Sequence, residues 1–121
     1  MKTYATCLSI AGSDPSGGAG LQADLKTFTL LGAYGQAVPT ALTVQNSRGV
    51  QRSVPVDASL VRDQLEAVLG DLPPQAVKIG MLPTAEVAEA VAGALERHRP
   101  PFVVMDPVMV SSSGYPLVAD D

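Results

Sequence analysis

Short apolar runs alternate along the chain with segments in which apolar residues recur every three or four positions. The runs predict buried strands and the recurring segments predict amphipathic helices. The predicted strands are residues 4–10, 34–44, 76–79 and 102–105, and the predicted helices are residues 18–31, a segment from Asp57 to about Gly70, and a segment after Thr84. Strands that alternate with helices indicate βαβ units, so the sequence predicts an α/β fold with a parallel sheet between two layers of helices.

Cap and turn residues support these boundaries. Asp57 and Thr84 precede their helical segments and are residue types that cap helix N-termini. Pro39 predicts a bend in the second strand, because proline cannot donate to a sheet ladder. Residues Ser47 to Val56 contain alternating valines and are expected to form a short extended flap outside the main sheet.

A glycine-rich loop, Gly12 to Gly20, joins the first strand to the first helix. Gly12 and Gly17 have Walker A spacing, but Gly18 and Ala19 stand where that motif needs Lys and Ser or Thr. The glycines also fail the dinucleotide pattern G-x-G-x-x-G. The loop could hold an anion or a polar ring substituent, because glycines and a helix N-terminus expose backbone amides. A simple tight connection is an equally acceptable interpretation at this stage.

Asp24 faces the apolar side of the first predicted helix. With Leu21 at zero and a step of 100° per residue, Leu25, Phe28 and Leu31 form an arc that includes Asp24. A carboxylate on a buried face needs a hydrogen-bond or charge partner, in a cleft or in the glycine loop. Two roles for Asp24 stay open, a structural one that ties down the loop and one that contacts a ligand.

Polar and apolar groups are expected to meet at one edge of the sheet. Ligands of open α/β sheets bind beyond the carboxyl ends of the strands. The residues that follow the predicted strands are the Gly12 to Gly20 loop, Gln45 and Asn46, Gly80 and Met81, and Asp106. An amide, a thioether, a carboxylate and backbone amides together suit a flat ring with polar edges better than a sugar phosphate.

Composition narrows the classes of partner. The 121 residues carry a net charge of −4, with 46% hydrophobic and 4% aromatic residues, which argues against nucleic-acid and anionic-membrane surfaces. No apolar run has transmembrane length and no secretory signal opens the chain, so a cytoplasmic protein is expected. The single Cys7 is predicted to be a buried, inert thiol. His98, the only histidine, lies in a basic last helical turn, which argues against a His-based triad and a His-containing zinc cluster.

Four runs in the sequence resemble a known family. They are AGSDPSGGAGLQADLKTF, LGAYGQAVPTALTVQNSRGVQ, VKIGML and DPVMV. Together they resemble the hydroxymethylpyrimidine/phosphomethylpyrimidine kinases of thiamine biosynthesis, which belong to the ribokinase-like superfamily. The resemblance implies a ribokinase-like three-layer sandwich of which residues 1–121 form the N-terminal half.

The family resemblance implies a reaction and a set of site residues. The reaction is phosphorylation of 4-amino-5-hydroxymethyl-2-methylpyrimidine, and then of its monophosphate, with ATP and Mg²⁺. By position, Gln45 matches the residue that reads the pyrimidine edge, and an amide can pair with a ring nitrogen and its neighbouring amino group. Gly12 and Asp24 match positions near the substrate, Met81 matches an apolar wall, and Asp106 matches an acidic position near phosphate and magnesium.

The resemblance also marks what this stretch of sequence lacks. In the family a G-T-G-C loop supplies the anion hole and the catalytic base, so both are expected beyond residue 121, with most of the ATP site. Ser112 and Tyr115 stand where the family commonly has Lys and Asp. A homodimer is expected for the full-length protein. Two alternatives to the hydroxymethylpyrimidine kinase function stay open: a pyridoxal-type vitamin kinase and a catalytically inactive pyrimidine-binding fragment.

Overall fold

The computed structural model describes residues 3–106 as one α/β unit of five strands and three helices. All segments predicted as strands or helices from the sequence are found, with shifted ends in several cases. The elements are β1 (Thr6–Gly12), α1 (Gly20–Leu30), β2 (Tyr34–Asn46), β3 (Gly49–Pro55), α2 (Ala58–Asp71), β4 (Ala76–Ile79), α3 (Ala85–His98) and β5 (Phe102–Met105). Ser112 and Tyr115 lie outside the described residues.

The strands form a single sheet in the order β3-β2-β1-β4-β5. The pairs β1–β2, β1–β4 and β4–β5 are parallel, which confirms the predicted βαβ arrangement. The expectation of a flap outside the sheet for residues 47–56 is wrong. Gly49–Pro55 pairs antiparallel with β2 and extends the main sheet, because β2 is long enough to continue past its neighbour β1 and offer a free edge.

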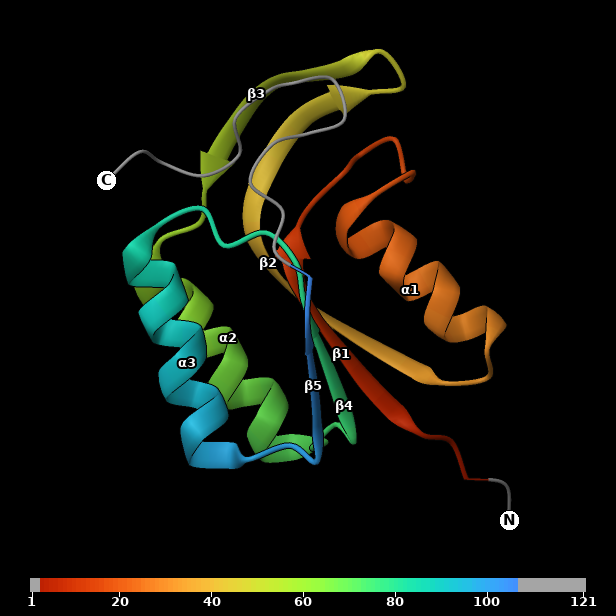
Figure 1. Ribbon diagram of the computed structural model, residues 1–121, viewed down its shortest axis with the longest axis vertical. Helices are drawn as coiled ribbons and strands as arrows, with labels where there is room; N and C mark the ends of the chain where they lie inside the picture. Colours follow the sequence, from red (N-terminus) through yellow and green to blue (C-terminus); the bar gives the residue numbers. More distant parts are fainter. Residues whose placement is uncertain (1–2, 107–121) are drawn as a thin grey trace.

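Helices cover both faces of the sheet, so the expected three-layer sandwich is confirmed (Figure 1). Helix α1 packs on one face, over β1 and β2, and α2 and α3 lie together on the other. The hydrophobic core lies between the sheet and the α2–α3 pair. Its fully buried members include Leu8, Ile10, Val38, Val61, Leu65 and Val87.

The predicted caps are confirmed and two strand ends are corrected. Asp57 accepts a hydrogen bond from the Ser59 amide, and Thr84 accepts one from the Val87 amide at 3.1 Å. Strand β1 runs two residues beyond Ile10, to Gly12. Strand β2 ends at Asn46, so Gln45 lies inside the strand and not in a loop after it. The ladder with β3 holds these last residues extended.

The apolar arc of α1 is only partly buried. Leu21 is buried, and Leu25 and Phe28 lie close over Gly35, where a Cβ would meet both side chains. Leu31, predicted to be on the same arc, is 81% exposed because the helix ends at Leu30 and the chain turns there. Cys7 is half-buried instead of fully buried, so that expectation is also corrected. No helix within residues 3–106 is both long and apolar enough to cross a bilayer.

Candidate functional site at the carboxyl edge of the sheet

The glycine-rich loop closes around its own aspartate. Asp14 is buried, with 3% of its surface exposed, and its carboxylate accepts hydrogen bonds from three backbone amides and one hydroxyl. The donors are Ser16 N, Ser16 Oγ, Gly18 N and Ala19 N, at 2.9, 2.6, 3.1 and 2.9 Å. The sequence predicted these amides as a possible anion site, and the anion they hold here belongs to the loop itself.

The same contacts set the charge state of Asp14. Burial on its own raises the pKa of this carboxyl, but the hydrogen bonds from Ser16, Ala19 and Gly18 favour the ionised form. Their combined effect keeps the pKa below its ordinary value of 3.8. Asp14 is therefore a fixed negative charge near neutral pH, and it makes the loop a rigid structure.

Two further residues tie this loop to its neighbours. The Gln22 side chain of α1 accepts from the Asp14 amide at 2.8 Å and donates to Ser13 Oγ at 2.8 Å. On the other side, the Ser13 amide donates to the Ala41 carbonyl of β2 at 2.9 Å. The loop is thus fixed between α1 and β2.

Gly12 brings the loop into contact with the segment that follows β4. A Cβ on Gly12 would lie 2.6 Å from Met81 Cε, so any larger residue at this position would displace the end of the Met81 side chain. Met81 is buried at 5% exposure, and its carbonyl accepts from the Thr40 hydroxyl at 2.6 Å. The structure therefore brings together two of the residues predicted from the sequence, in direct contact.

Gln45 reaches the glycine loop through Thr43. The Thr43 hydroxyl lies 2.7 Å from the Ser13 carbonyl and 3.1 Å from Gln45 Oε1. A hydroxyl has one proton, and the shorter contact to the Ser13 carbonyl takes it. The Gln45 contact is satisfied when its amide is turned so that the nitrogen donates to Thr43. Gln45 is half-buried.

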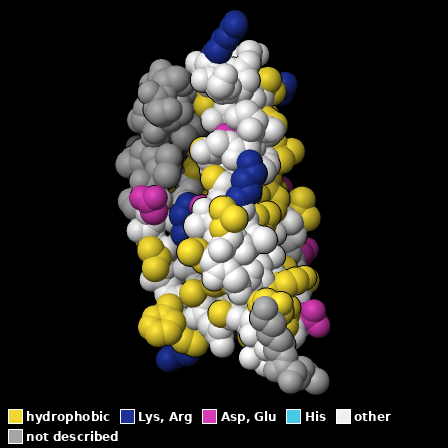
Figure 2. Space-filling view, turned by 90° about the vertical axis from the view of Figure 1, so that its right-hand side faces the viewer, with side chains coloured by type: hydrophobic (Ala, Val, Ile, Leu, Met, Phe, Trp, Pro, Cys, Tyr) yellow, Lys and Arg dark blue, Asp and Glu magenta, His cyan; other side chains and the backbone are white. Residues whose placement is uncertain are grey.

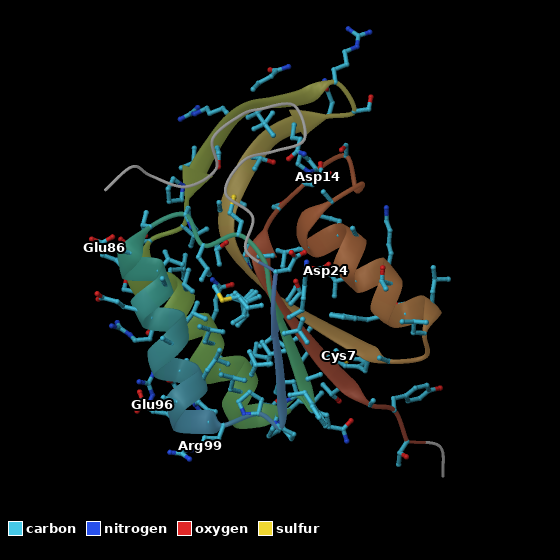
Figure 3. All side chains as sticks on the ribbon, in the orientation of Figure 1. Cys7, Asp14, Asp24, Glu86, Glu96 and Arg99 are labelled. Atoms are coloured by element: carbon cyan, nitrogen blue, oxygen red, sulfur yellow. The ribbon has the colours of Figure 1, made fainter. Side chains whose placement is uncertain are left out.

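Asp24 has its partners in the sheet and not in the loop. Its carboxylate accepts from Ser9 Oγ of β1 at 2.6 Å and from Lys78 Nζ of β4 at 3.0 Å. Figure 3 shows Asp24 on α1 directed toward the sheet, below the loop that carries Asp14. Asp24 therefore has a structural role, but a different one from the role predicted: it joins α1 to the sheet. The residue that ties down the loop is Asp14.

Asp106 follows β5 at the same end of the sheet. Its amide donates to the Ile79 carbonyl of β4 at 2.8 Å, and the residue is exposed. Among residues 3–106, no three His, Cys, Asp or Glu side chains are grouped as in a metal cluster. Mg²⁺ is commonly held by one or two carboxylates together with substrate phosphates. An exposed, single Asp106 fits one such carboxylate.

A groove of about 300 Å³ lies elsewhere, between α2 and α3. Its lining mixes Arg62 and Arg97 with Glu86 and Glu89, on the face opposite α1. His98 and Arg97 at the end of α3 both contact Glu66 of α2, so His98 is paired across two helices. The groove lies on the helix layer and contains none of the residues predicted from the sequence as site residues, and its mixed charges select no ligand class.

Sequence reasoning missed Asp14, Ser9 and Lys78 as members of this region. Asp14 carried a signal, because Asp followed by Ser two residues later in a glycine-rich turn is an Asx-turn pattern. Lys78 also carried one, since a lysine inside a four-residue apolar strand needs a partner. Its pairing with Asp24 depends on the packing of α1 over β1, which lies beside β4 in the sheet, and local patterns do not encode this packing.

Comparisons with known proteins place the chain in a family. A family profile described as phosphomethylpyrimidine kinase matches residues 14–121. The hydroxymethylpyrimidine/phosphomethylpyrimidine kinase of Escherichia coli K12 is 52% identical over 112 residues, which are 93% of this chain and 42% of that protein. The corresponding Rhizobium meliloti kinase is 53% identical over 117 residues, 97% of this chain and 44% of the relative.

Solved structures agree in fold. The phosphomethylpyrimidine kinase crystal structure from Clostridium difficile 630 superposes with a TM-score of 0.87 at 48% identity, covering 95% of this chain and 50% of that one. The pyridoxal kinase from Staphylococcus aureus in complex with pyridoxal gives a TM-score of 0.81 at 38% identity, covering 90% and 40%. The chain spans about half the length of these relatives or less. On the family match over residues 14–121, the chain belongs to the phosphomethylpyrimidine kinase family.

Proposed function

We propose that this chain is the N-terminal, substrate-binding half of a kinase that phosphorylates 4-amino-5-hydroxymethyl-2-methylpyrimidine and its monophosphate in thiamine biosynthesis. One observation carries the proposal. The glycine loop, Met81 and the Thr43–Gln45 pair meet at the carboxyl edge of the sheet, in a chain that belongs to the phosphomethylpyrimidine kinase family.

The proposed ring pocket uses Gly12, Met81 and Gln45. Met81 is 5% exposed, so it forms a fixed floor against Gly12 and does not project into a cavity. Gln45 is held by Thr43 at one end of its amide, and the free end offers a hydrogen-bonding group to the edge of an aminopyrimidine. A flat ring with polar edges matches this combination of an apolar floor and one oriented amide.

The chain's share of the phosphoryl-transfer apparatus is small. ATP supplies the phosphoryl group, and Mg²⁺ when bound neutralises charge on its phosphates. Asp106 is exposed at the correct edge and would hold the metal through its carboxylate. The loop amides of Ser16, Gly18 and Ala19 are occupied by Asp14 and are not offered to phosphate. The catalytic base belongs to the proposed second half, beyond residue 121.

The proposal also covers the cellular location of the protein, its macromolecular partners and its oligomeric state. A chain of net charge −4 with small-molecule substrates fits a cytoplasmic enzyme that binds neither nucleic acid nor membrane. The full-length protein is proposed to be a homodimer. Residues 1–121 are proposed to be one half of a single ribokinase-like domain, because the sheet continues to an exposed strand at β5.

Isothermal titration of the chain with two ring ligands tests the proposal. The first ligand is 4-amino-5-hydroxymethyl-2-methylpyrimidine and the second is pyridoxal, the ligand in one S. aureus neighbour structure. The proposal predicts saturable binding of the pyrimidine and binding of pyridoxal that is at least tenfold weaker. Tighter binding of pyridoxal would favour the vitamin-kinase alternative, and binding of neither ring would contradict the proposed substrate-binding role.

A further inference from the structure

A partly buried ion pair joins three elements beneath the candidate site. Ser9 of β1 and Lys78 of β4 are directly opposite each other in the parallel ladder. Asp24 of α1 contacts both, through Ser9 Oγ at 2.6 Å and Lys78 Nζ at 3.0 Å. Ser9 is fully buried, and the Asp24 and Lys78 side chains are 15% and 28% exposed. Water screens this pair much less than it screens a surface pair.

The Lys78 ammonium lies next to the segment that forms the pocket floor. A Cβ on Gly80 would be 3.7 Å from Lys78 Nζ and 2.8 Å from Ala11 Cβ. Gly80 directly precedes Met81, and its amide donates to the Ile10 carbonyl at 2.8 Å. The lysine side chain thus extends from the middle of β4 to the level at which β4 gives way to Met81.

The spacing around this segment leaves little tolerance for movement. The close approaches of Gly80 to Ala11 and of Gly12 to Met81 require β1 and β4 to hold one relative position. The position of helix α1 relative to β1 is constrained in the same way, because a Cβ on Gly20 in its first turn would lie 2.3 Å from the Gly12 carbonyl oxygen. Asp24 and Lys78 form the charged contact that links these elements.

We propose that Lys78, held by Asp24 and Ser9, is a positioning residue for the pyrimidine pocket, a role that rests on the proposed function. It fixes Gly80 and Met81 against Gly12, and so sets the floor on which the ring is bound. The competing role is a purely structural one, in which the ion pair stabilises the packing of α1 on the sheet and the position of Met81 does not depend on it.

The test uses Lys78→Gln in the 121-residue chain, with Arg97→Gln as the matched control. Arg97 pairs with Glu66 between α2 and α3, so its loss removes a more exposed ion pair that also joins two elements but contains none of the proposed pocket residues. Two readouts are compared, the ¹³C methyl signal of Met81 in the free protein and the affinity for 4-amino-5-hydroxymethyl-2-methylpyrimidine. Both are measured well below the melting temperature of each variant.

Lys78→Gln is expected to shift or broaden the Met81 methyl signal and to weaken pyrimidine binding at least tenfold, whereas Arg97→Gln leaves both unchanged. Lys78→Gln leaves a charged Asp24 without its cation, so Asp24→Asn/Lys78→Gln serves as a second variant that contains no unpaired charge. The double variant is expected to show the same altered methyl signal.

A wild-type Met81 signal in the folded single or double variant, with only a lower melting temperature, would overturn the positioning role. The methyl readout requires no ligand. A wild-type chain that fails to bind the pyrimidine therefore counts against the proposed function, while the Met81 signal still decides whether Lys78 positions the pocket floor.

Discussion

Gly12 and Met81 lie so close that a single added methyl group on Gly12 would come within 2.6 Å of the Met81 Cε atom. The two residues are 69 positions apart: Gly12 is the last residue of β1, and Met81 follows β4, the strand beside it. A side chain at position 12 would therefore push the end of the Met81 side chain out of its present position. This contact makes Gly12 a sensitive point for changing the pocket floor without changing the fold.

Gly12→Ala is predicted to alter the pocket more than the stability. The atom in the way is the end of a flexible methionine side chain, and turning it away from its preferred rotamer costs about 0.5–1.5 kcal/mol. We expect a small decrease in melting temperature and a clear loss of pyrimidine affinity, measured by calorimetry.

Gly20→Ala provides the contrasting case. Gly20 has φ of 60°, and an added Cβ would lie 2.3 Å from the rigid Gly12 carbonyl oxygen. The left-handed conformation alone costs roughly 1–2 kcal/mol for alanine, and the backbone clash adds to it. Gly20→Ala should therefore lower the melting temperature much more than Gly12→Ala does. Equal melting temperatures for the two variants would contradict the account of this loop.

Asp14 is predicted to make folding sensitive to acid. Its pKa is lowered in the folded state, so its contribution to stability is complete above the unfolded value near 4 and is lost as the pH falls through the folded pKa. Asp14→Asn removes this contribution. Urea unfolding between pH 7 and pH 2.5 should show a smaller acid-induced loss in the variant than in the wild type.

Asp57 and Glu66 also have lowered pKa values, and they contribute to acid sensitivity in the wild type and in Asp14→Asn alike. The difference between the stability–pH curves of these two proteins therefore isolates the contribution of Asp14. Parallel curves for wild type and Asp14→Asn would mean that the loop amides do not depend on this carboxylate.

Self-association is predicted at the β5 edge. All four residues of β5 are exposed, from Val103 at 46% to Phe102 at 69%, and β5 is the last strand of the described sheet. Figure 2 shows further hydrophobic side chains on the face of the molecule that carries α1. Apolar edge strands favour association between chains. Val104→Lys should shift the chain toward monomer in analytical ultracentrifugation, while Leu31→Lys, a control at the exposed end of α1, should not.

Residues 1–121 alone are predicted to show no ATP-dependent kinase activity. Phosphoryl transfer needs bound metal, positioned phosphates and an oriented nucleophile. The described residues offer one exposed acid, Asp106, and a glycine loop whose amides are already used by Asp14. A radiolabelled phosphate-transfer assay checks this. Turnover that disappears in Gln45→Leu would place the catalytic centre in this half of the fold, because a contaminating kinase would be unaffected.

The sequence pattern predicted the layers of the fold more completely than the details of the site. Alternating apolar runs and amphipathic segments were enough to predict four strands and three helices, because burial on both faces of a parallel sheet leaves a strong local signal. Strand β3 was assigned outside the sheet. Its residues are mostly exposed, and the local alternation does not reveal that β2 is long enough to pair with it.

Prediction of the site from the sequence was also limited by contacts between residues far apart in the chain. The rule that carboxyl ends of parallel strands converge predicted that Gly12 and Met81 lie at the same edge of the sheet, but not that they are in contact. The partner of Asp24 was not predicted, because helical angles identify the face of the helix on which a residue lies but not the strand that this face covers. Lys78 is 54 positions from Asp24, and only the packed sheet brings them within 3.0 Å.

The most direct measurement for the proposed function is the affinity of the chain for 4-amino-5-hydroxymethyl-2-methylpyrimidine in Gln45→Leu compared with wild type. Gln75→Leu is the control, because Gln75 is an exposed residue that precedes β4 at the opposite end of the sheet. Loss of a hydrogen bond to the ring edge is worth roughly 1–3 kcal/mol, so Gln45→Leu should bind about 5-fold to 150-fold more weakly. Gln75→Leu should bind as wild type does. Equal affinity in all three proteins, each folded by circular dichroism, would contradict the claim that the carboxyl edge of this sheet binds the pyrimidine.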